Sequence, residues 1–414
     1  MLVIRKSKIR SGDLKLFLGV ALMGIAYEFI VVNHCRMFEV DLDSYAYLAV
    51  DYSIGFCSRL LPGAIYHLLV GVYDYTTASI YLMFFYIIYI LLLSALIVKI
   101  VKRIPKDCSF ASIVLLVLLL TGSFSISMYF KQVGILDFYL SFFLVIALLL
   151  VDNKYLKYSI PVISFLMVLV HYSADISHLT ILFMVLLGFI LFAKNKKTRI
   201  EYSIILVISA LIAVTASLYF MKYDQANLKY TVDEFTQLMK SRKAEDATYY
   251  IYGLYRVVPE SFIATAGDKV IKDLTSIPSG DLFGSIKMQI LYNLRFVSIR
   301  GITITSSLCL VFAVFLYSIF IKYIRSVSEK KVKLFCIMVL LVFPVFLLSS
   351  LLFSTDYVRW FGHGIVFMIA MVFTISLQID TRILKSSQDI LSRFNPFVIP
   401  LVFLNAMIIL NPYN

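Results

Sequence analysis

The sequence predicts an all-α polytopic membrane protein with about eleven transmembrane helices and a helical cap outside the membrane. Of its 414 residues, 61% are hydrophobic and only 15% are charged, and the mean hydropathy is +0.90. Apolar runs of about 20 residues recur along the chain, the length that crosses a bilayer as a helix. Lys and Arg alternate between dense and sparse connections. These features nearly exclude soluble enzymes, disordered chains and nucleic-acid-binding proteins.

The expected spans begin near the N-terminus. A basic segment precedes an apolar stretch from Leu16 that carries Glu28, and no small-residue cleavage site follows, so we expect an uncleaved first span. The chain as a whole, residues 1–414, is expected to form a single integral membrane domain. Ten further spans are expected near residues 78–98, 109–129, 135–151, 159–176, 179–193, 203–221, 301–321, 334–353, 362–378 and 396–411.

Positive charge sets the orientation of these spans. Connections on the N-terminal side are rich in Lys and Arg, and this places the N-terminus in the cytoplasm. The net charge of +13, from 38 basic and 25 acidic residues, is then mostly a topology signal, and no nucleic acid or other anionic partner is needed to explain it. The basic residues of the opposite short loops are Arg36, Arg59, Lys131 and Arg359.

Two segments on the outer side are longer than a turn. Residues 35–77 form the first outer loop, whose amphipathic stretch from Ala64 to Tyr75 is expected to lie in the membrane interface. Residues 222–300 form a larger loop with helix-like stretches around Thr231–Arg242 and Ser285–Arg295. We expect the larger loop to form a small helical cap.

Ionisable side chains also gather on the outer side, and such groups near hydrocarbon usually mark a functional site. Chance and the longer outer loops could place any single histidine there. All five on one side, with further charges beside them, favour an outer cavity. These residues are His34, His67, His171, His178 and His363.

The first outer loop contains Asp41, Asp43 and Asp51, followed by Arg59. Asp41 and Asp43 look like the Asp-x-Asp that holds a metal-bound nucleotide sugar, but nucleotide sugars are cytoplasmic and this loop faces outward. A sugar donor on this side would be linked to a polyprenyl phosphate or pyrophosphate, and one carboxylate would serve as general base toward an acceptor hydroxyl. The plainer interpretation is an acidic, solvated loop.

A second group lies at the outer end of the fifth expected span. On a helix, His171 and Asp175 would be one turn apart, so that the carboxylate orients the histidine as a base or keeps it protonated against a phosphate. An interfacial cluster with satisfied hydrogen bonds is the plainer interpretation. His171 and His178 lack the compact spacing of zinc motifs, so no cofactor is predicted and a divalent metal is not supported by spacing.

A third group lies at the outer end of the ninth expected span and contains Asp356, Arg359 and His363. Arg359 suits phosphate oxygens because its guanidinium binds them in a bidentate manner. Lys131 and Asp137 are expected to line the same cavity. The chain has no Walker, G-x-S-x-G, GxGxxG or HExxH motif. Cys35 and Cys57 both face outward, and the sequence leaves open whether they pair.

Taken together, these features resemble the polysaccharide polymerases of the Wzy and EpsG type, which are envelope proteins related in architecture to the GT-C glycosyltransferases. The resemblance rests on short motifs in the first outer loop and at two later span ends, and on the large outer loop. The features are Asp41, Asp43 and Tyr45, the Gly55-to-Gly63 segment with Arg59, His171-Tyr172-Ser173, residues 222–300, and Asp356-Tyr357-Val358-Arg359.

What this resemblance implies is polymerisation of lipid-linked O-antigen or capsule repeat units at the outer leaflet. The substrate would be an undecaprenyl-linked glycan, Arg59 and Arg359 would hold its phosphates, and a carboxylate or histidine would activate the acceptor. The partners would be membrane lipid and a chain-length regulator or flippase.

Four alternatives stay open. One is a GT-C glycosyltransferase that uses a polyprenyl-phosphate sugar, and a second is a transporter or flippase for envelope glycan precursors. Transporters usually place ionisable groups near the bilayer midplane, whereas Glu28, Lys131 and Asp137 lie toward outer span ends. A membrane acyltransferase and an assembly protein are the remaining two.

Overall fold

The computed structural model describes residues 11–27, 42–121, 134–172, 177–224, 226–244, 299–353 and 357–393. Within these ranges all regular secondary structure is α-helical or 3-10 helical, apart from one isolated bridge between Gly55 and Leu228. The predicted all-α class is therefore confirmed.

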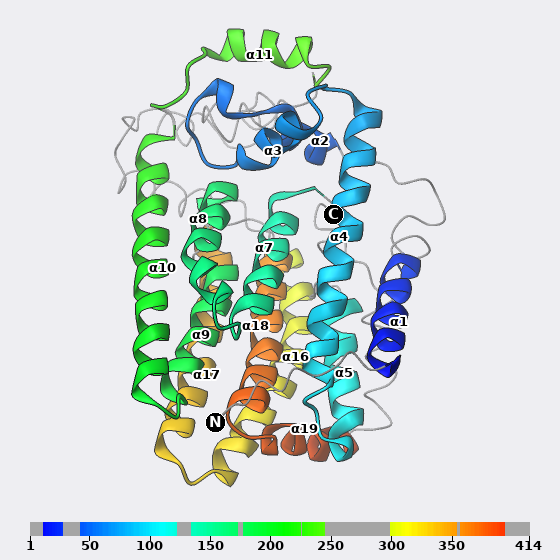
Figure 1. The fold of residues 1–414 in the computed structure, drawn as a ribbon, viewed down its shortest axis with the longest axis vertical. Helices are drawn as coiled ribbons and strands as arrows, with labels where there is room; N and C mark the ends of the chain where they lie inside the picture. The colour runs from blue at the N-terminus through cyan, green and yellow to red at the C-terminus, as the bar shows by residue number, and fades with distance from the viewer. Residues whose placement is uncertain are drawn as a thin grey trace.

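Most of the described helices form an elongated bundle (Figure 1). Helix α10 packs against α8 and α9, α18 against α9 and α17, α4 against α1 and α7, and α16 against α17 and α18. The bundle helices are α1 (Ser11–Tyr27), α4 (Tyr75–Val101), α5 (Ser109–Thr121), α7 (Leu136–Leu150), α8 (Ile160–Val170), α9 (His178–Leu191), α10 (Lys196–Tyr223), α16 (Ile299–Ser326), α17 (Lys330–Phe353) and α18 (Tyr357–Gln378).

Each expected span up to residue 378 overlaps one of these helices, and residues 396–411 lie outside the described residues. Among the described helices, α4 and α10 are long and apolar enough to cross a membrane, and several others are apolar but shorter. Two such helices agree with membrane association. The total of eleven spans and the orientation stay predictions.

A group of short helices covers one end of the bundle, and we call this end the cap end (Figure 1). The cap consists of α2 (Leu42–Ala49), the 3-10 helix η2 (Tyr52–Ile54), α3 (Leu61–Leu69) and α11 (Val232–Ser241). Helix α11 begins with a capping box, in which the Thr231 hydroxyl accepts a hydrogen bond from the Glu234 backbone N–H and the Glu234 carboxylate accepts one from the Thr231 backbone N–H. Its position agrees with the helix-like stretch predicted around Thr231–Arg242.

Helix α3 differs from the amphipathic stretch predicted for Ala64–Tyr75. It begins three residues earlier, where Pro62 suits the first helical turn, and ends at Leu69. The chain then turns at Gly71, whose φ of 73° is left-handed, and Asp74 caps the start of α4 through the Thr77 backbone N–H. Leu68 and Leu69 are 83% and 68% exposed, as expected for a helix on a membrane interface.

The opposite end of the bundle, the far end, is crossed by α19 (Arg382–Arg393) (Figure 1). We expected these residues to form a charged connection. They form a helix because Ile383, Leu384, Ile390 and Leu391 share one face, which is buried against α5, α16 and α18. Ion pairs at the far end join Lys102 to Asp13, Lys157 to Glu201 and Lys322 to Asp389.

Candidate functional site

The described residues that we predicted to be functional lie at the cap end, where the cap meets the bundle. They form two groups in the structure. One is a network within the cap around Asp51, and the other lies beneath it, where helices α7, α9 and α18 begin. Arg59 and His171 lie at the junction between cap and bundle.

Asp51 is buried in the cap, and its carboxylate has three partners. It accepts a hydrogen bond from the Ser53 N–H at 2.6 Å and another from the Tyr73 hydroxyl, and it lies 3.3 Å from Nη1 of Arg242. Burial alone would raise the pKa of Asp51, but the bonds from Ser53 and Tyr73 and the charge of Arg242 outweigh it, so the pKa is below 3.8. A carboxylate held in this way is a poor general base.

Arg242, at the end of α11, connects this helix to the part of the cap that the first loop forms. Its Nη1 donates to the Ala49 carbonyl at 2.8 Å, and its Cζ lies 4.4 Å from the centre of the Tyr73 ring. The Tyr45 hydroxyl donates in turn to the Arg242 carbonyl at 3.1 Å. The residues around Asp51 thus tie α11 to the first loop, which gives Asp51 a structural role, and the catalytic role stays a prediction.

Arg59 lies where the cap meets the bundle. Its backbone N–H donates to the Leu169 carbonyl at the end of α8, at 2.9 Å. Its φ of 71° is left-handed, a conformation that costs a non-glycine residue about 1–2 kcal/mol. The Nε atom is buried, and Cζ lies 5.6 Å from the centre of the Tyr172 ring.

The segment that carries Arg59 is fastened to the end of α10. Asp224 accepts hydrogen bonds from the Ser58 backbone and hydroxyl at 2.8 and 2.6 Å, and its carbonyl accepts one from the Cys57 thiol. Cys57 is a free thiol, and burial raises its pKa to about 12. Gly55 permits this docking, because a Cβ there would lie 2.3 Å from the Asn227 carbonyl oxygen.

His171 is not on a helix. Helix α8 ends at Val170, and His171 has an extended backbone with φ of −160° and ψ of 125°. The expectation that His171 and Asp175 face the same way one turn apart is therefore wrong. The helix must end here because α8 and α9 both pack along α10, and the chain reverses direction between them. The His171 ring lies 5.0 Å from the Tyr172 ring, the same ring that the Arg59 guanidinium approaches.

Asp137, His178 and His363 meet beneath the cap, although they come from three separate helices. The His363 Nε2 atom lies 3.5 Å from Oδ1 of Asp137, and the rings of His178 and His363 are 4.9 Å apart in an edge-to-face arrangement. All three side chains are buried. One ligand atom from each lies within 4.8 Å of the other two.

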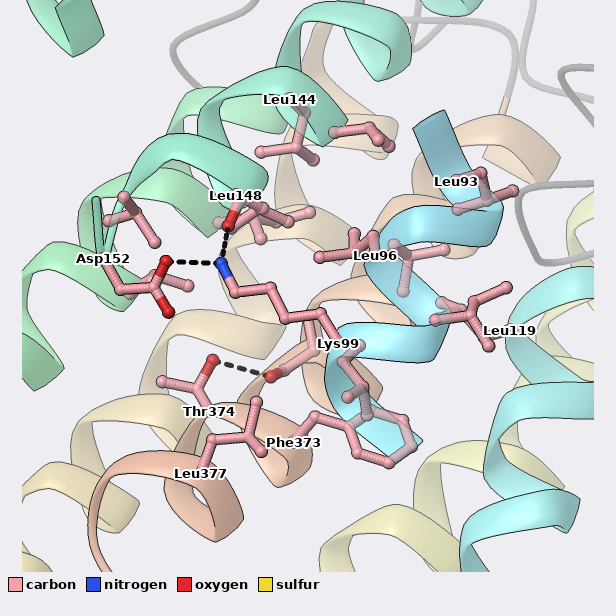
Figure 2. A pocket seen from close by; sticks show the side chains of 18 of the residues that line it. Leu93, Leu96, Lys99, Leu119, Leu144, Leu148, Asp152, Phe373, Thr374 and Leu377 are labelled. Atoms are coloured by element: carbon pink, nitrogen blue, oxygen red, sulfur yellow. Dashed lines mark hydrogen bonds and ion pairs between the residues drawn. The ribbon is translucent and has the colours of Figure 1, made fainter. Parts of the chain in front are cut away.

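An apolar cavity of about 120 Å³ lies between α4, α5, α7, α9 and α18. His178 lines it toward the cap, and Lys99 lines it toward the far end. Lys99 donates to the Leu148 carbonyl at 3.0 Å and to Asp152 at 2.6 Å, as Figure 2 shows. The rest of the lining is mostly leucine, isoleucine, valine and phenylalanine.

The other predicted site residues are described only in part. Asp43 lies in α2 and Arg359 in α18, and their side chains are outside the described structure. Asp41, Lys131, Asp175 and Asp356 lie outside the described residues altogether.

The sequence pointed to most of these residues separately but did not predict how they group. From the sequence we considered His178 together with His171, seven residues away, whereas the structure places His178 beside His363. Arg242 and Tyr73 were missed, because a single Arg in a long loop and a Tyr before a span carry no distinctive spacing. The signal that could have identified Arg242 is that a buried carboxylate such as Asp51 requires a cationic partner.

Comparison of the chain with family models, with curated proteins and with solved structures finds no match.

Proposed function

We propose that this protein polymerises or transfers a glycan carried on undecaprenyl phosphate or pyrophosphate, at the outer face of a bacterial inner membrane. In this proposal the chain has eleven spans, the N-terminus is cytoplasmic and the cap faces outward. The product is a surface polysaccharide such as O-antigen or capsule. Membrane lipid surrounds the bundle, and a flippase delivers the substrate.

The observation that carries the proposal is Arg59. Its left-handed backbone is costly and its Nε atom is buried, and such strain persists where surrounding contacts impose it, often at functional sites. Arg59 lies beside the ring of Tyr172, which in turn lies beside that of His171, between the cap and the helix ends. A planar cation in this place suits the phosphate oxygens of a lipid-linked substrate.

The distribution of ionisable groups supports a reaction on one side of the membrane. The far end presents ion pairs whose side chains are mostly partly exposed, such as Lys102 with Asp13 and Lys322 with Asp389, and Lys157 is a buried exception. The cap end holds buried groups, among them Asp51, Asp137 and His363. Buried ionisable groups mark candidate functional sites, whereas exposed ion pairs contribute little to stability and mark no site.

The apolar cavity bears on the transporter alternative. A transport pathway for a charged glycan would need polar groups along its length, whereas here the ionisable lining residues lie at the two ends, with His178 toward the cap and Lys99, Arg103 and Asp152 toward the far end. The lining suits a hydrocarbon chain better than a sugar. The cavity therefore favours an enzyme that binds a lipid-linked substrate over a transporter.

Complementation of a deletion strain tests the proposal. Deletion of the gene should remove or shorten the surface polysaccharide, and Arg59→Ala should fail to restore it. Arg59→Gly provides a sharper variant, because glycine accepts a φ of 71° and relieves the backbone cost. We expect Arg59→Gly to accumulate at wild-type level in the membrane and to lack activity.

Arg199→Ala is the matched control, because Arg199 is an exposed far-end arginine in the first turn of α10 and does not line the cavity. It should restore wild-type polysaccharide. Unchanged polysaccharide in the deletion strain would contradict the proposed function. Full activity of Arg59→Gly would remove Arg59 from the site. Supplying purified protein with either a pyrophosphate-linked repeat unit or a monophosphate-linked sugar separates polymerisation from single-sugar transfer.

A further inference from the structure

We propose that Asp137, His178 and His363 bind a zinc ion beneath the cap. The inference goes beyond glycan transfer and does not depend on it. The three side chains belong to α7, α9 and α18, each lies near the cap-end start of its helix, and α9 packs against both other helices. The packing of buried helices holds the three side chains in fixed relation.

The distances suit a small cation. Zinc binds nitrogen and carboxylate oxygen at about 2.0–2.2 Å in a tetrahedral arrangement, which places neighbouring ligand atoms about 3.4 Å apart. The His363 Nε2 and Asp137 Oδ1 atoms are already 3.5 Å apart. The ligand atoms of the whole set lie within 4.8 Å of one another, so side-chain rotations that move the atoms by about 1 Å would complete the geometry.

The contact with Ser177 also indicates which ring nitrogen of His178 would bind the metal. Its Nδ1 atom lies 3.0 Å from the Ser177 hydroxyl oxygen, and a metal-binding histidine usually engages its second nitrogen in such a bond. The Nε2 atom is then the ligand. Ser177 thus serves as a positioning residue, because its hydroxyl fixes the orientation and tautomer of the ring.

The donor set selects the class of metal. Two imidazoles and one carboxylate favour zinc over magnesium or calcium, which prefer oxygen ligands. A bound metal would also explain why three ionisable groups that are 2%, 3% and 8% exposed lie together, since buried charges are usually paired or coordinate a metal. Three protein ligands with a fourth from water or substrate is the composition of catalytic zinc sites.

The sequence had indicated no metal, because His171 and His178 lack metal-ligand spacing. The site in the structure uses residues separated along the chain by whole helices, and such sets carry no local motif. His178 also lines the apolar cavity, so the zinc ion would lie at the cap-end limit of that cavity.

Metal binding to the purified full-length protein tests the proposal. After chelator treatment, the protein is equilibrated with Zn²⁺ alone, dialysed and analysed by mass spectrometry for metal content. We expect about one Zn²⁺ per chain in the wild type and a loss of at least tenfold in affinity for His178→Ala and His363→Ala. Co²⁺ in place of Zn²⁺ should give the visible bands of a tetrahedral site.

His67→Ala is the matched control, because His67 is exposed and stacks on Tyr73 in the cap. It should bind Zn²⁺ as the wild type does. His363→Cys retains a zinc ligand at the same position and should keep most of the binding even if His363→Ala fails to fold. A wild-type protein that retains no Zn²⁺, or alanine variants that bind like the wild type, would overturn the proposal. Two histidines and one carboxylate also bind Fe²⁺, so preferential retention of Fe²⁺ by protein equilibrated anaerobically with equal Zn²⁺ and Fe²⁺ would overturn the assignment to zinc.

The two proposals can fail separately. Loss of polysaccharide in Arg59→Gly with normal Zn²⁺ content would support glycan transfer alone, and normal Zn²⁺ binding in a protein whose deletion leaves the polysaccharide unchanged would support the metal site alone.

Discussion

Asp51 shows how a residue that carries a functional pattern in the sequence takes a structural role in the fold. In the sequence it belongs to an acidic loop that suggests catalysis. In the structure its carboxylate is occupied by Ser53, Tyr73 and Arg242, which lower its pKa below 3.8. The same contacts that make Asp51 a weak base make it important for holding the cap together.

Asp51→Asn should destabilise the protein by roughly 3 kcal/mol, because Arg242 would keep a buried charge without its counter-ion. Thermal unfolding in detergent at pH 7 measures this as a lower Tm. Because the folded pKa is depressed, the contribution is fully present above pH 3.8 and is lost as the pH falls through the lower folded value. The Tm difference between wild type and variant should therefore shrink below pH 3.8.

Asp107→Asn serves as the control, since Asp107 is exposed at the far end. It should leave Tm within about 1 °C of the wild type, because surface changes seldom exceed 0.5 kcal/mol. A constant Tm difference at every pH would show that Asp51 acts through shape and not through its charge.

At the scale of elements, the docking of α2 against α3 depends on Gly63. A Cβ at this position would lie 1.7 Å from the Val50 carbonyl oxygen and 2.8 Å from that of Tyr47. Both atoms belong to the backbone, so no side-chain rotation can relieve the contact. The first turn of α3 therefore approaches the end of α2 more closely than any other residue type would permit.

Gly63→Ala should accordingly separate α3 from α2 and expose the cap to proteases. Limited proteolysis of the purified protein should cut the variant within residues 50–62 at least tenfold faster than the wild type. Gly12→Ala is the control, because nothing lies within 4 Å of a Cβ at that position. Equal cleavage of Gly63→Ala and wild type would contradict the close approach.

The elements that the sequence predicted well are those governed by local pattern. The bundle helices follow from uninterrupted apolar runs, and α11 follows from the spacing of Thr231 and Glu234. Helix α19 was missed because its charges suggested a cytoplasmic connection, although Ile383, Leu384, Ile390 and Leu391 already recur with helical period. Groups such as His178 with His363 could not be predicted, because helix packing alone determines which span ends meet.

At the scale of the whole molecule, the bundle has a cap end and a far end, and the expected orientation assigns them to opposite sides of the membrane. This is testable with single cysteines in a variant that lacks native cysteine. Asp233→Cys, exposed on α11, should react in intact cells with a maleimide that cannot cross membranes. Tyr155→Cys, which replaces a far-end side chain that is 72% exposed, should react only after the cells are opened.

Reaction of Tyr155→Cys in intact cells would reverse the orientation and place the candidate site in the cytoplasm. Reaction of both positions only after lysis would instead place both ends on the inner side and contradict the three spans that are expected between residues 155 and 233. Either result would require a nucleotide-activated donor to be reconsidered.

The contacts within the cap also impose an order on biosynthesis. Ala49 and Arg242 are separated by 193 residues, yet they bond directly. At a synthesis rate of about 5–20 residues per second, the ribosome reaches Arg242 roughly 10–40 seconds after it has synthesised Ala49. In the expected orientation, the segment from α2 to α3 lies outside the membrane during that interval without Asp224 or Arg242. In that orientation, a nascent chain that stops before Arg242 would present an acidic, partly apolar segment to quality-control proteases on the outer side.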